Sequence, residues 1–140
     1  MIIMAIDYGD VRTGIAVCDK FEMLASPVCV ITQRDSDKVI EEIQKLSLEY
    51  KVERFVVGLP KNMDSSVGER ALKCTDFAEK LRDRTGIEAV MRDERLSTVS
   101  AHNVLNNTNT RGKKRKNVVD QVAAVMILQD YIDFRKNSNI

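Results

Sequence analysis

The sequence predicts an α/β domain built on a five-stranded mixed sheet that is flanked by helices. Three observations support this class: the chain opens with three strand-like segments, later strand-like segments alternate with amphipathic helical ones, and 140 residues suffice for one compact core. Strands joined through a helix pair in parallel, whereas the opening three can pair antiparallel across short turns. We therefore expect residues 1–140 to form a single domain.

The first three strands are predicted from short apolar runs. Residues 2–6 are continuously apolar and rich in β-branched side chains, which is typical of a central strand covered on both faces. This strand ends at Asp7. Residues 13–18 and 26–32 form the next two strands of an antiparallel meander, and Pro27 suits an edge position because it lacks a backbone donor.

A helix over residues 37–50 and a strand over residues 54–59 follow. Apolar side chains at helical spacing form the predicted buried stripe of this helix: Val39, Ile43, Leu46 and Tyr50. Ser66 and Glu69 match a capping box that would open a second helix, and Gly86 would end it.

The remaining elements are a strand over residues 87–91, a short helix over 97–105, a loop over 106–117 and a final helix over 118–134. The segment 106–117 is polar and ends in a run of positive charges, which predicts a mobile basic loop. The final helix carries a core-facing stripe: Val119, Ala123, Met126, Ile127 and Tyr131.

Composition narrows the class of protein. No apolar run approaches the roughly 20 residues that cross a bilayer, and the first residues lack the basic region of a signal peptide, so we expect a cytoplasmic protein with no membrane partner. The cysteines are widely spaced and are expected to be core thiols: Cys18, Cys29 and Cys74. The 22 basic and 21 acidic side chains nearly balance, so the net charge alone does not indicate a polyanionic partner.

Asp7 is the first candidate site residue. It ends a buried strand and precedes a turn region that contains Gly9 and Gly14. Because an ionised carboxylate is costly to desolvate, Asp7 needs either a cation or hydrogen-bond donors. It is therefore either a metal ligand or a turn residue satisfied by donors. The glycines permit close backbone approach, which also suits a phosphate.

Further acids could join Asp7. Asp93 and Glu94 follow the last predicted strand on opposite faces, so only one of them can reach Asp7, and a solvated charge run is the alternative. Asp120 is predicted in the first turn of the final helix, where it either stabilises the helix dipole or lies along the core-facing stripe toward Asp7. Carboxylates gathered at one sheet edge require divalent cations, and oxygen ligands favour Mg²⁺ or Mn²⁺.

Positive charges cluster just before the final helix, at Arg111, Lys113, Lys114, Arg115 and Lys116. Such a run is either a solvated loop or a phosphate-binding segment. Its position beside the predicted acidic site favours phosphate binding, because carboxylates alone would repel a nucleic-acid backbone.

The order of elements is that of the RNase H-like fold. Actin-like ATPases use the same layout in each of two domains around a nucleotide cleft, and this chain can hold only one such unit. A phosphotransfer enzyme of that kind is therefore disfavoured, although residues 7–14 could serve one.

Four motifs resemble the YqgF/RuvX family, which includes Holliday junction resolvase-like proteins and pre-16S rRNA nucleases. They cover nearly the whole chain in the family's order: DYGDVRTGIAV, VVGLPKNMDSSVGER, DERLST and DQVAAVMILQDYI. The resemblance implies an RNase H-like nuclease in which Asp7, Glu94 and Asp120 are the catalytic and metal-binding residues.

Two departures from the family accompany this resemblance. The family usually reads Asp-Gly-Ser where this chain has Asp64, Ser65 and Ser66. Related resolvases carry their middle acid after the fourth strand, where this chain has Gly58 and Leu59, so Glu94 would reach in from the neighbouring strand.

These implications lead to a hypothesis of metal-assisted phosphodiester hydrolysis. Asp7 would bridge two divalent ions roughly 4 Å apart, Glu94 and Asp120 would complete their ligand shells, and Arg12, Arg95 or the basic run would hold flanking phosphates.

The leading substrate is precursor rRNA, free or in ribosomal precursor particles, and branched DNA is the alternative. A homodimer with paired sites would favour DNA junctions, whereas a monomer would favour RNA trimming. A non-catalytic nucleic-acid-binding or ribosome-assembly factor is a further possibility. Aromatic residues are only 5% of the chain, which gives no support for sequence-specific recognition of single-stranded bases.

Overall fold

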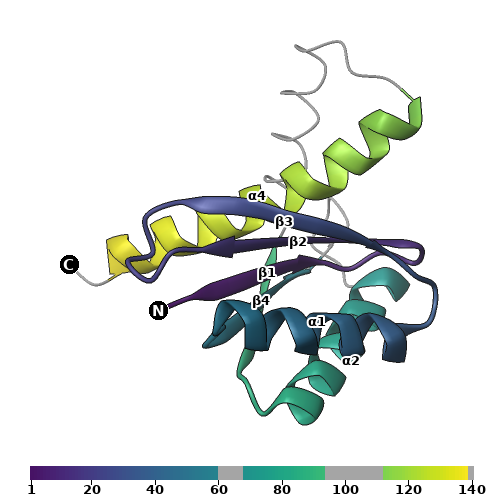
Figure 1. The fold of residues 1–140 in the computed structure, drawn as a ribbon, viewed down its shortest axis with the longest axis horizontal. Coiled ribbons are helices and arrows are strands. Elements are labelled where there is room, and N and C mark those ends of the chain that lie inside the picture. Colours follow the sequence, from purple (N-terminus) through teal and green to yellow (C-terminus); the bar gives the residue numbers. More distant parts are fainter. Residues whose placement is uncertain (60–67, 94–111, 139–140) are drawn as a thin grey trace.

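The computed structural model describes residues 1–59, 68–93 and 112–138, with the side chains at 93, 112–120 and 138 excepted. Within these residues, five strands form one sheet that has helices on both faces (Figure 1). The strands are β1 (Ile3–Asp7), β2 (Arg12–Cys18), β3 (Ala25–Thr32), β4 (Arg54–Leu59) and β5 (Ala89–Asp93). The helices are α1 (Ser36–Tyr50), α2 (Glu69–Thr85) and α4 (Gly112–Ser138).

The sheet has the order β3-β2-β1-β4-β5, with β1 in the centre. β1 pairs antiparallel with β2, which pairs antiparallel with β3, whereas β1, β4 and β5 are parallel neighbours. The predicted meander and the predicted parallel pairing are both confirmed. Pro27 lies in the edge strand β3, where its missing backbone donor is tolerated.

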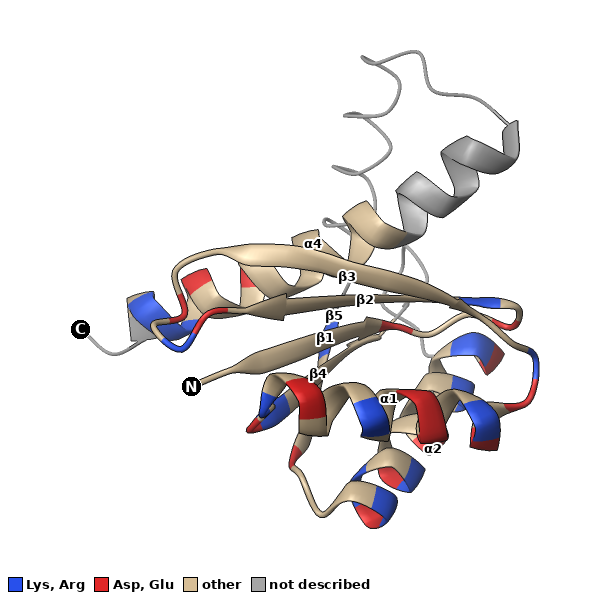
Figure 2. Ribbon diagram, viewed as in Figure 1, with Lys and Arg blue, Asp and Glu red and all other residues tan. Residues whose placement is uncertain are grey.

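Strand alternation divides the core into two layers. Met4 and Ile6 pack among the buried residues on the α1 and α2 side, whereas Ile3 and Ala5 pack with the buried residues of α4. Figure 1 shows α1 and α2 on one face of the sheet and α4 on the other. Charged residues are frequent along α1 and α2, whereas the strands are mostly uncharged (Figure 2).

Helix α1 begins and ends with well-defined caps. The Asp35 carboxylate accepts a hydrogen bond from the Asp37 amide at 2.9 Å, and Lys51 takes a left-handed conformation (φ 56°) as its amide donates to the Ser47 carbonyl. The predicted stripe is confirmed at Val39 and Ile43 but is wrong at Tyr50, which is 37% exposed. Ser47 and Ile40 are buried on this helix instead.

The prediction for α2 is correct at its carboxyl end and wrong at its amino end. Gly86 ends the helix in the left-handed conformation (φ 71°), as predicted. The capping-box prediction is wrong, because the N-cap residue is Gly68 and no side chain caps the helix. Ser66 lies outside the described residues.

Two boundaries near the end of the chain also differ from the prediction. β5 covers Ala89–Asp93 rather than 87–91, because pairing with β4 begins only at the Phe55–Ala89 pair. α4 begins at Gly112 rather than 118, so the loop prediction is wrong for residues 112–117, while 106–111 and the predicted helix over 97–105 lie outside the described residues. Asp120 is therefore in the third turn of α4, and the prediction that it occupies the first turn is wrong.

The turn between β2 and β3 connects the start of the chain to α4. Asp19 accepts hydrogen bonds from the amides of Phe21, Met23 and Leu24. Glu22, which has a positive φ of 54°, binds both the Met1 ammonium at 3.0 Å and Arg135 at 2.6 Å. The amino end of β1 and the carboxyl end of α4 thus meet at one carboxylate.

Two other expectations from composition concern the thiols and membrane spans. Cys18 and Cys74 are buried, as predicted for core thiols, and Cys29 is partly buried. In the segments that the structure describes, no helix combines the length and the apolar character needed to span a membrane.

Candidate active site

Asp7 is the last residue of the central strand and is partly buried. Because it continues the odd-numbered set that contains Ile3 and Ala5, its side chain belongs to the face that α4 covers. Its antiparallel partner is Gly14, which contributes no side chain beside it. The carboxylate therefore stands at the end of the central strand, opposite a residue without a side chain.

Arg12 lies near Asp7 across the β1–β2 pair. The register pairs Asp7 with Gly14, so Arg12, two residues before Gly14, is on the same face and in the diagonal position. Arg12 is partly buried at the start of β2. The structure thus brings one predicted phosphate-binding residue next to the first predicted catalytic acid.

The backbone of α4 carries position 120 toward the same end of the sheet. The amino end of β1 and the carboxyl end of α4 lie together (Figure 1), where Glu22 binds both Met1 and Arg135. From Met1, β1 extends about 20 Å to Asp7. From Arg135 back to position 120, α4 extends about 22 Å in the same direction. The two positions are therefore at similar levels along the sheet.

Helical periodicity also places position 120 on the side of α4 that faces the sheet. It precedes Ala124 by four residues and Ile127 by seven, and both of these side chains are completely buried against the sheet. Ala123 and Tyr131 are buried as predicted, and Met126 is partly buried. The Asp120 and Val119 side chains lie outside what the structure describes.

The two faces of β5 are assigned by their contacts. Ala89 and Met91 pack into the core on the α1 and α2 side. Val90 packs into the α4 core, and Arg92 forms an ion pair of 2.7 Å with Asp130 of α4. Even-numbered positions of β5 therefore face α4 and share a side with Asp7.

The other predicted site residues fall at or beyond the limits of the described residues. Glu94, Arg95 and Arg111 lie outside them, whereas the four remaining basic residues are in the first two turns of α4: Lys113, Lys114, Arg115 and Lys116. Among the side chains that are described, no three acidic, histidine or cysteine residues lie close enough to hold a metal ion. Of the three predicted acids, only Asp7 has a described side chain.

The turn that follows Asp7 is held by α2. The Arg70 guanidinium donates to the Tyr8 carbonyl at 3.0 Å and lies 3.7 Å from Asp10, while the Lys73 ammonium lies 3.9 Å from the same carboxylate. The Tyr8 ring stacks on Phe77, with centroids 4.0 Å apart and planes 13° apart. Tyr8 is thus fixed to α2, and Asp10 lies beside the same helix.

Gly9 is required by the close packing of this turn. A Cβ at this position would overlap the Arg12 carbonyl oxygen, which belongs to the backbone and cannot rotate away. The Gly9 amide donates to the Thr13 hydroxyl at 3.4 Å, and Thr13 is completely buried. Sequence reasoning identified Gly9 but missed Arg70 and Lys73, whose only local signal is their spacing of three residues at the start of a helix.

Burial and charge both act on Tyr8. Partial desolvation against α2 raises the pKa of its phenol, and the nearby Asp10 carboxylate raises it further. The phenol is therefore protonated at neutral pH, and its structural role is to stack on Phe77.

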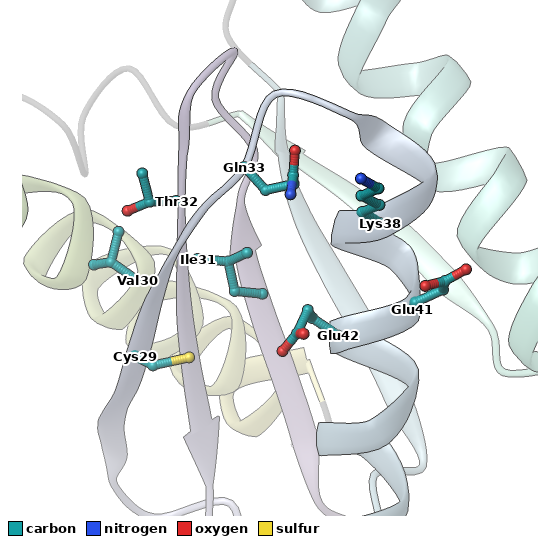
Figure 3. A pocket seen from close by; sticks show the side chains of 8 residues that line it. All are labelled: Cys29, Val30, Ile31, Thr32, Gln33, Lys38, Glu41 and Glu42. Atoms are coloured by element: carbon teal, nitrogen blue, oxygen red, sulfur yellow. The ribbon is translucent and has the colours of Figure 1, made fainter.

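A pocket elsewhere on the molecule does not coincide with the predicted acids. It lies between β3 and α1 and has a volume of about 420 Å³. Figure 3 shows Ile31 and Cys29 pointing toward α1, with Lys38 and Glu42 opposite them on the helix. The pocket contains none of the residues predicted to be catalytic.

Similarity to known proteins covers nearly the whole chain. A family model described as "RuvX: Holliday junction resolvase" matches residues 1–134. The chain belongs to the RuvX family. A "Putative pre-16S rRNA nuclease" from Halothermothrix orenii is 44% identical over 135 residues, covering 96% of each chain. One of the same description from Listeria innocua is 43% identical over 135 residues, covering 95% of this chain and 98% of its own.

Solved structures confirm the RNase H-like fold of this RuvX chain. Thermus thermophilus RuvC in complex with a Holliday junction substrate superposes with a TM-score of 0.63 at 11% identity, covering 99% of this chain and 97% of RuvC. The fowlpox virus Holliday junction resolvase gives a TM-score of 0.58 at 11% identity, covering 96% and 99%. At such identities the likeness establishes the fold alone. The predicted enzyme class, a nuclease that hydrolyses phosphodiester bonds, is confirmed by the family and by the curated relatives.

Proposed function

We propose that this chain is a metal-dependent nuclease that matures the 5′ end of pre-16S rRNA, with Asp7, Glu94 and Asp120 as its catalytic acids. The observation that carries the proposal is the position of Asp7, a partly buried carboxylate at the end of the central strand, on the face covered by α4. The relatives described as pre-16S rRNA nucleases, at 39–44% identity, support this substrate.

Asp120 is proposed as the second acid because its position on α4 is compatible with Asp7. Measured along β1 and along the backbone of α4, both positions lie about 20 Å from the Glu22 contacts. An aspartate at the sheet-facing side of a helix needs a cation or donors, for the same reason as Asp7.

Glu94, rather than Asp93, is proposed as the third acid. Val90 and Arg92 of β5 face α4, and the proposal is that the alternation continues to Glu94, which lies outside the described residues. The odd-numbered residues Ala89 and Met91 pack on the opposite face, which α1 and α2 cover.

The donor set fits divalent metal ions of the hard class. Carboxylate oxygens prefer Mg²⁺ or Mn²⁺, and the residue paired with Asp7 is Gly14, which has no side chain. When bound, such ions would lower the pKa of an attacking water and neutralise charge that develops on the phosphate. Asp7 would hold and orient this group from the strand end. Arg12, in the diagonal position, would neutralise the phosphate oxygens that Asp7 repels.

The proposed surroundings of the reaction follow from the same chemistry. Arg95 and the basic residues from Arg111 to Lys116 would bind flanking phosphates of the RNA, which is either free or part of a ribosomal precursor particle. The protein would act in the cytoplasm, as a monomer if it trims single strands.

A second candidate is the resolution of Holliday junctions in DNA recombination and repair. The description of the matching family and the fold shared with RuvC favour it. Because a junction needs two symmetric cuts, this activity would require a homodimer with two sites.

The test compares wild-type protein with Asp7→Asn and with Asp83→Asn, a control that makes the same change at an exposed position of α2. Labelled pre-16S rRNA fragments and four-way DNA junctions are incubated with Mg²⁺, Mn²⁺ or a chelator. We expect metal-dependent RNA cleavage by wild type and Asp83→Asn, and a loss of at least 100-fold in Asp7→Asn with its circular dichroism spectrum unchanged. Cleavage of junctions alone would favour the second candidate. Tight RNA binding without cleavage by wild type would support a non-catalytic assembly factor.

A further inference from the structure

Two cations next to the proposed catalytic strand end have no part in the chemistry described so far. Arg70 and Lys73 lie on the first turns of α2, and both reach the turn that follows Asp7. Their side chains are 51% and 54% exposed, so they are open to solvent and to a ligand.

The geometry places Arg70 close to Asp7. Its guanidinium is 3.0 Å from the carbonyl oxygen of Tyr8, the residue next to Asp7. Adding the length of this backbone link gives at most about 9 Å between that guanidinium nitrogen and the Asp7 Cα. A group at this distance is within reach of a phosphate that neighbours one bound at Asp7.

The carboxylate that these cations share is a weak partner. Asp10 is 63% exposed, and its contacts of 3.7 Å to Arg70 and 3.9 Å to Lys73 exceed the 2.7–2.9 Å of strong charge-assisted hydrogen bonds. Exposed ion pairs with such geometry contribute little to stability. Two positive charges therefore face the single, loosely held negative charge of Asp10, which can match only one of them.

The surrounding turn is well packed, and Arg70 is held against it before a ligand binds. Tyr8 is stacked on Phe77 of the same helix, Gly9 has no room for a side chain, and the Arg70 guanidinium donates to the Tyr8 carbonyl. A donor that is already positioned loses less conformational entropy when it binds an anion.

We propose that Arg70 and Lys73 bind a backbone phosphate of the substrate adjacent to the scissile one, and that Asp10 occupies this place until the phosphate displaces it. The proposal rests on the proposed nuclease function for the identity of the anion. The group bound by Arg70 and Lys73 is the phosphodiester that RNA and DNA share, and these two residues recognise no base.

Salt dependence distinguishes a phosphate contact from a structural role. Each phosphate neutralised on a single strand adds about 0.7 to the slope of log K against log salt concentration. At 0.1 M salt the loss of one such contact corresponds to about fivefold weaker binding. A residue that only holds the turn would change affinity without changing this slope.

The experiment measures binding of a fluorescein-labelled single-stranded RNA by fluorescence anisotropy over a series of KCl concentrations, with a chelator present to prevent cleavage. We expect the double variant Arg70→Ala with Lys73→Ala to reduce the slope by about 0.7, each single substitution to produce part of that decrease, and Asp10→Asn to tighten binding severalfold. Lys80→Ala, an exposed cation farther along α2, is the matched control and should behave as wild type.

The outcomes separate this proposal from the nuclease function. Slopes of Lys73→Ala and Arg70→Ala equal to that of Lys80→Ala would overturn the phosphate site, even if Asp7→Asn abolishes cleavage. The expected slope changes would support it even if the wild type cleaves no substrate. Should Arg70→Ala fail to fold, Lys73→Ala and Asp10→Asn decide, because their side chains bind no backbone group in the described turn.

Discussion

Replacing Gly9 with alanine tests whether the turn after Asp7 is as constrained as its packing indicates. The new Cβ would overlap the Arg12 carbonyl oxygen, so the turn has to open or the start of β2 has to move. The Tyr8 carbonyl would be displaced relative to Arg70, and Asp7 and Arg12 would shift relative to one another.

The expected loss of stability depends on which atom the new Cβ would overlap. Overpacking a tight site typically costs about 1–3 kcal/mol when neighbours must shift, and a backbone oxygen shifts less readily than a side chain. For a protein of this size, such a loss corresponds to a decrease in Tm of about 3–12 °C. We also expect metal-dependent cleavage to fall by 10-fold or more, because the two residues bordering the turn belong to the proposed site.

Gly86→Ala is the matched control for this substitution. A Cβ there meets no atom within 4 Å, but the φ of 71° is unfavourable for alanine, so we expect a loss of stability of about 1 kcal/mol without loss of cleavage. Tm is measured by circular dichroism and cleavage with labelled RNA. Wild-type stability and wild-type activity in Gly9→Ala would refute the reasoning. A lowered Tm with full cleavage would show that the turn does not position Asp7.

Three further predictions concern stability and accessibility. Hydrogen bonding to Arg135 lowers the pKa of Glu22 below its ordinary value of 4.5, so its contribution is present above pH 4.5 and is lost as the pH falls through the lowered pKa. Glu22→Gln should therefore lower the free energy of unfolding by about 1–2 kcal/mol at pH 7. In acid, the urea midpoint of this variant should approach that of wild type. A difference in midpoint that is equal at all pH values would contradict this. Phe55→Ala, which empties a completely buried position, should lower the free energy of unfolding by about 3–5 kcal/mol in urea titration, and a loss below 1 kcal/mol would show that the core collapses around the site. Burial raises the pKa of the Cys18 and Cys29 thiols. After alkylation at pH 7, mass spectrometry should therefore find slow modification of the partly buried Cys29, whereas the buried Cys18 should react only in urea. Equal alkylation rates of the two thiols in the native protein would contradict this difference in burial.

The strands were predictable because each is a short apolar run limited by polar residues. Observed and predicted bounds agree within two residues for all five, and agree fully for β4. Gly86 was predictable as the end of α2, because the residue that ends a helix often takes a left-handed conformation and glycine adopts it readily. These features depend only on neighbouring residues, so one sequence is enough to predict them.

The errors arose where a local pattern was a poor guide to three-dimensional context. The basic residues at the start of α4 form no apolar stripe, so an amphipathic criterion misses them, although lysine and arginine are good helix formers. The Ser66 and Glu69 pattern is also satisfied by chance, and the helix begins after Gly68 without a side-chain cap.

The candidate site was only partly predictable for a similar reason. Asp7 is recognisable because a charge at the end of an apolar strand needs compensation. Its pairing with Gly14 and the diagonal position of Arg12 depend on register, which the sequence does not specify directly. Arg70 meets Asp10 across 60 positions of sequence, and no local signal connects them.

The two left-handed residues of the described chain that are not glycine differ in how far they can be changed. Glu22 is tied to its conformation by Met1 and Arg135, whereas Lys51 only terminates α1. Lys51→Gly should therefore relieve about 1 kcal/mol of backbone strain. Lys51 lies beside the pairing of Glu53 with Ile2, at the far end of β1 from Asp7. The stability gained there would lie far from the proposed catalytic end, and it could offset destabilising substitutions when that end is redesigned or evolves.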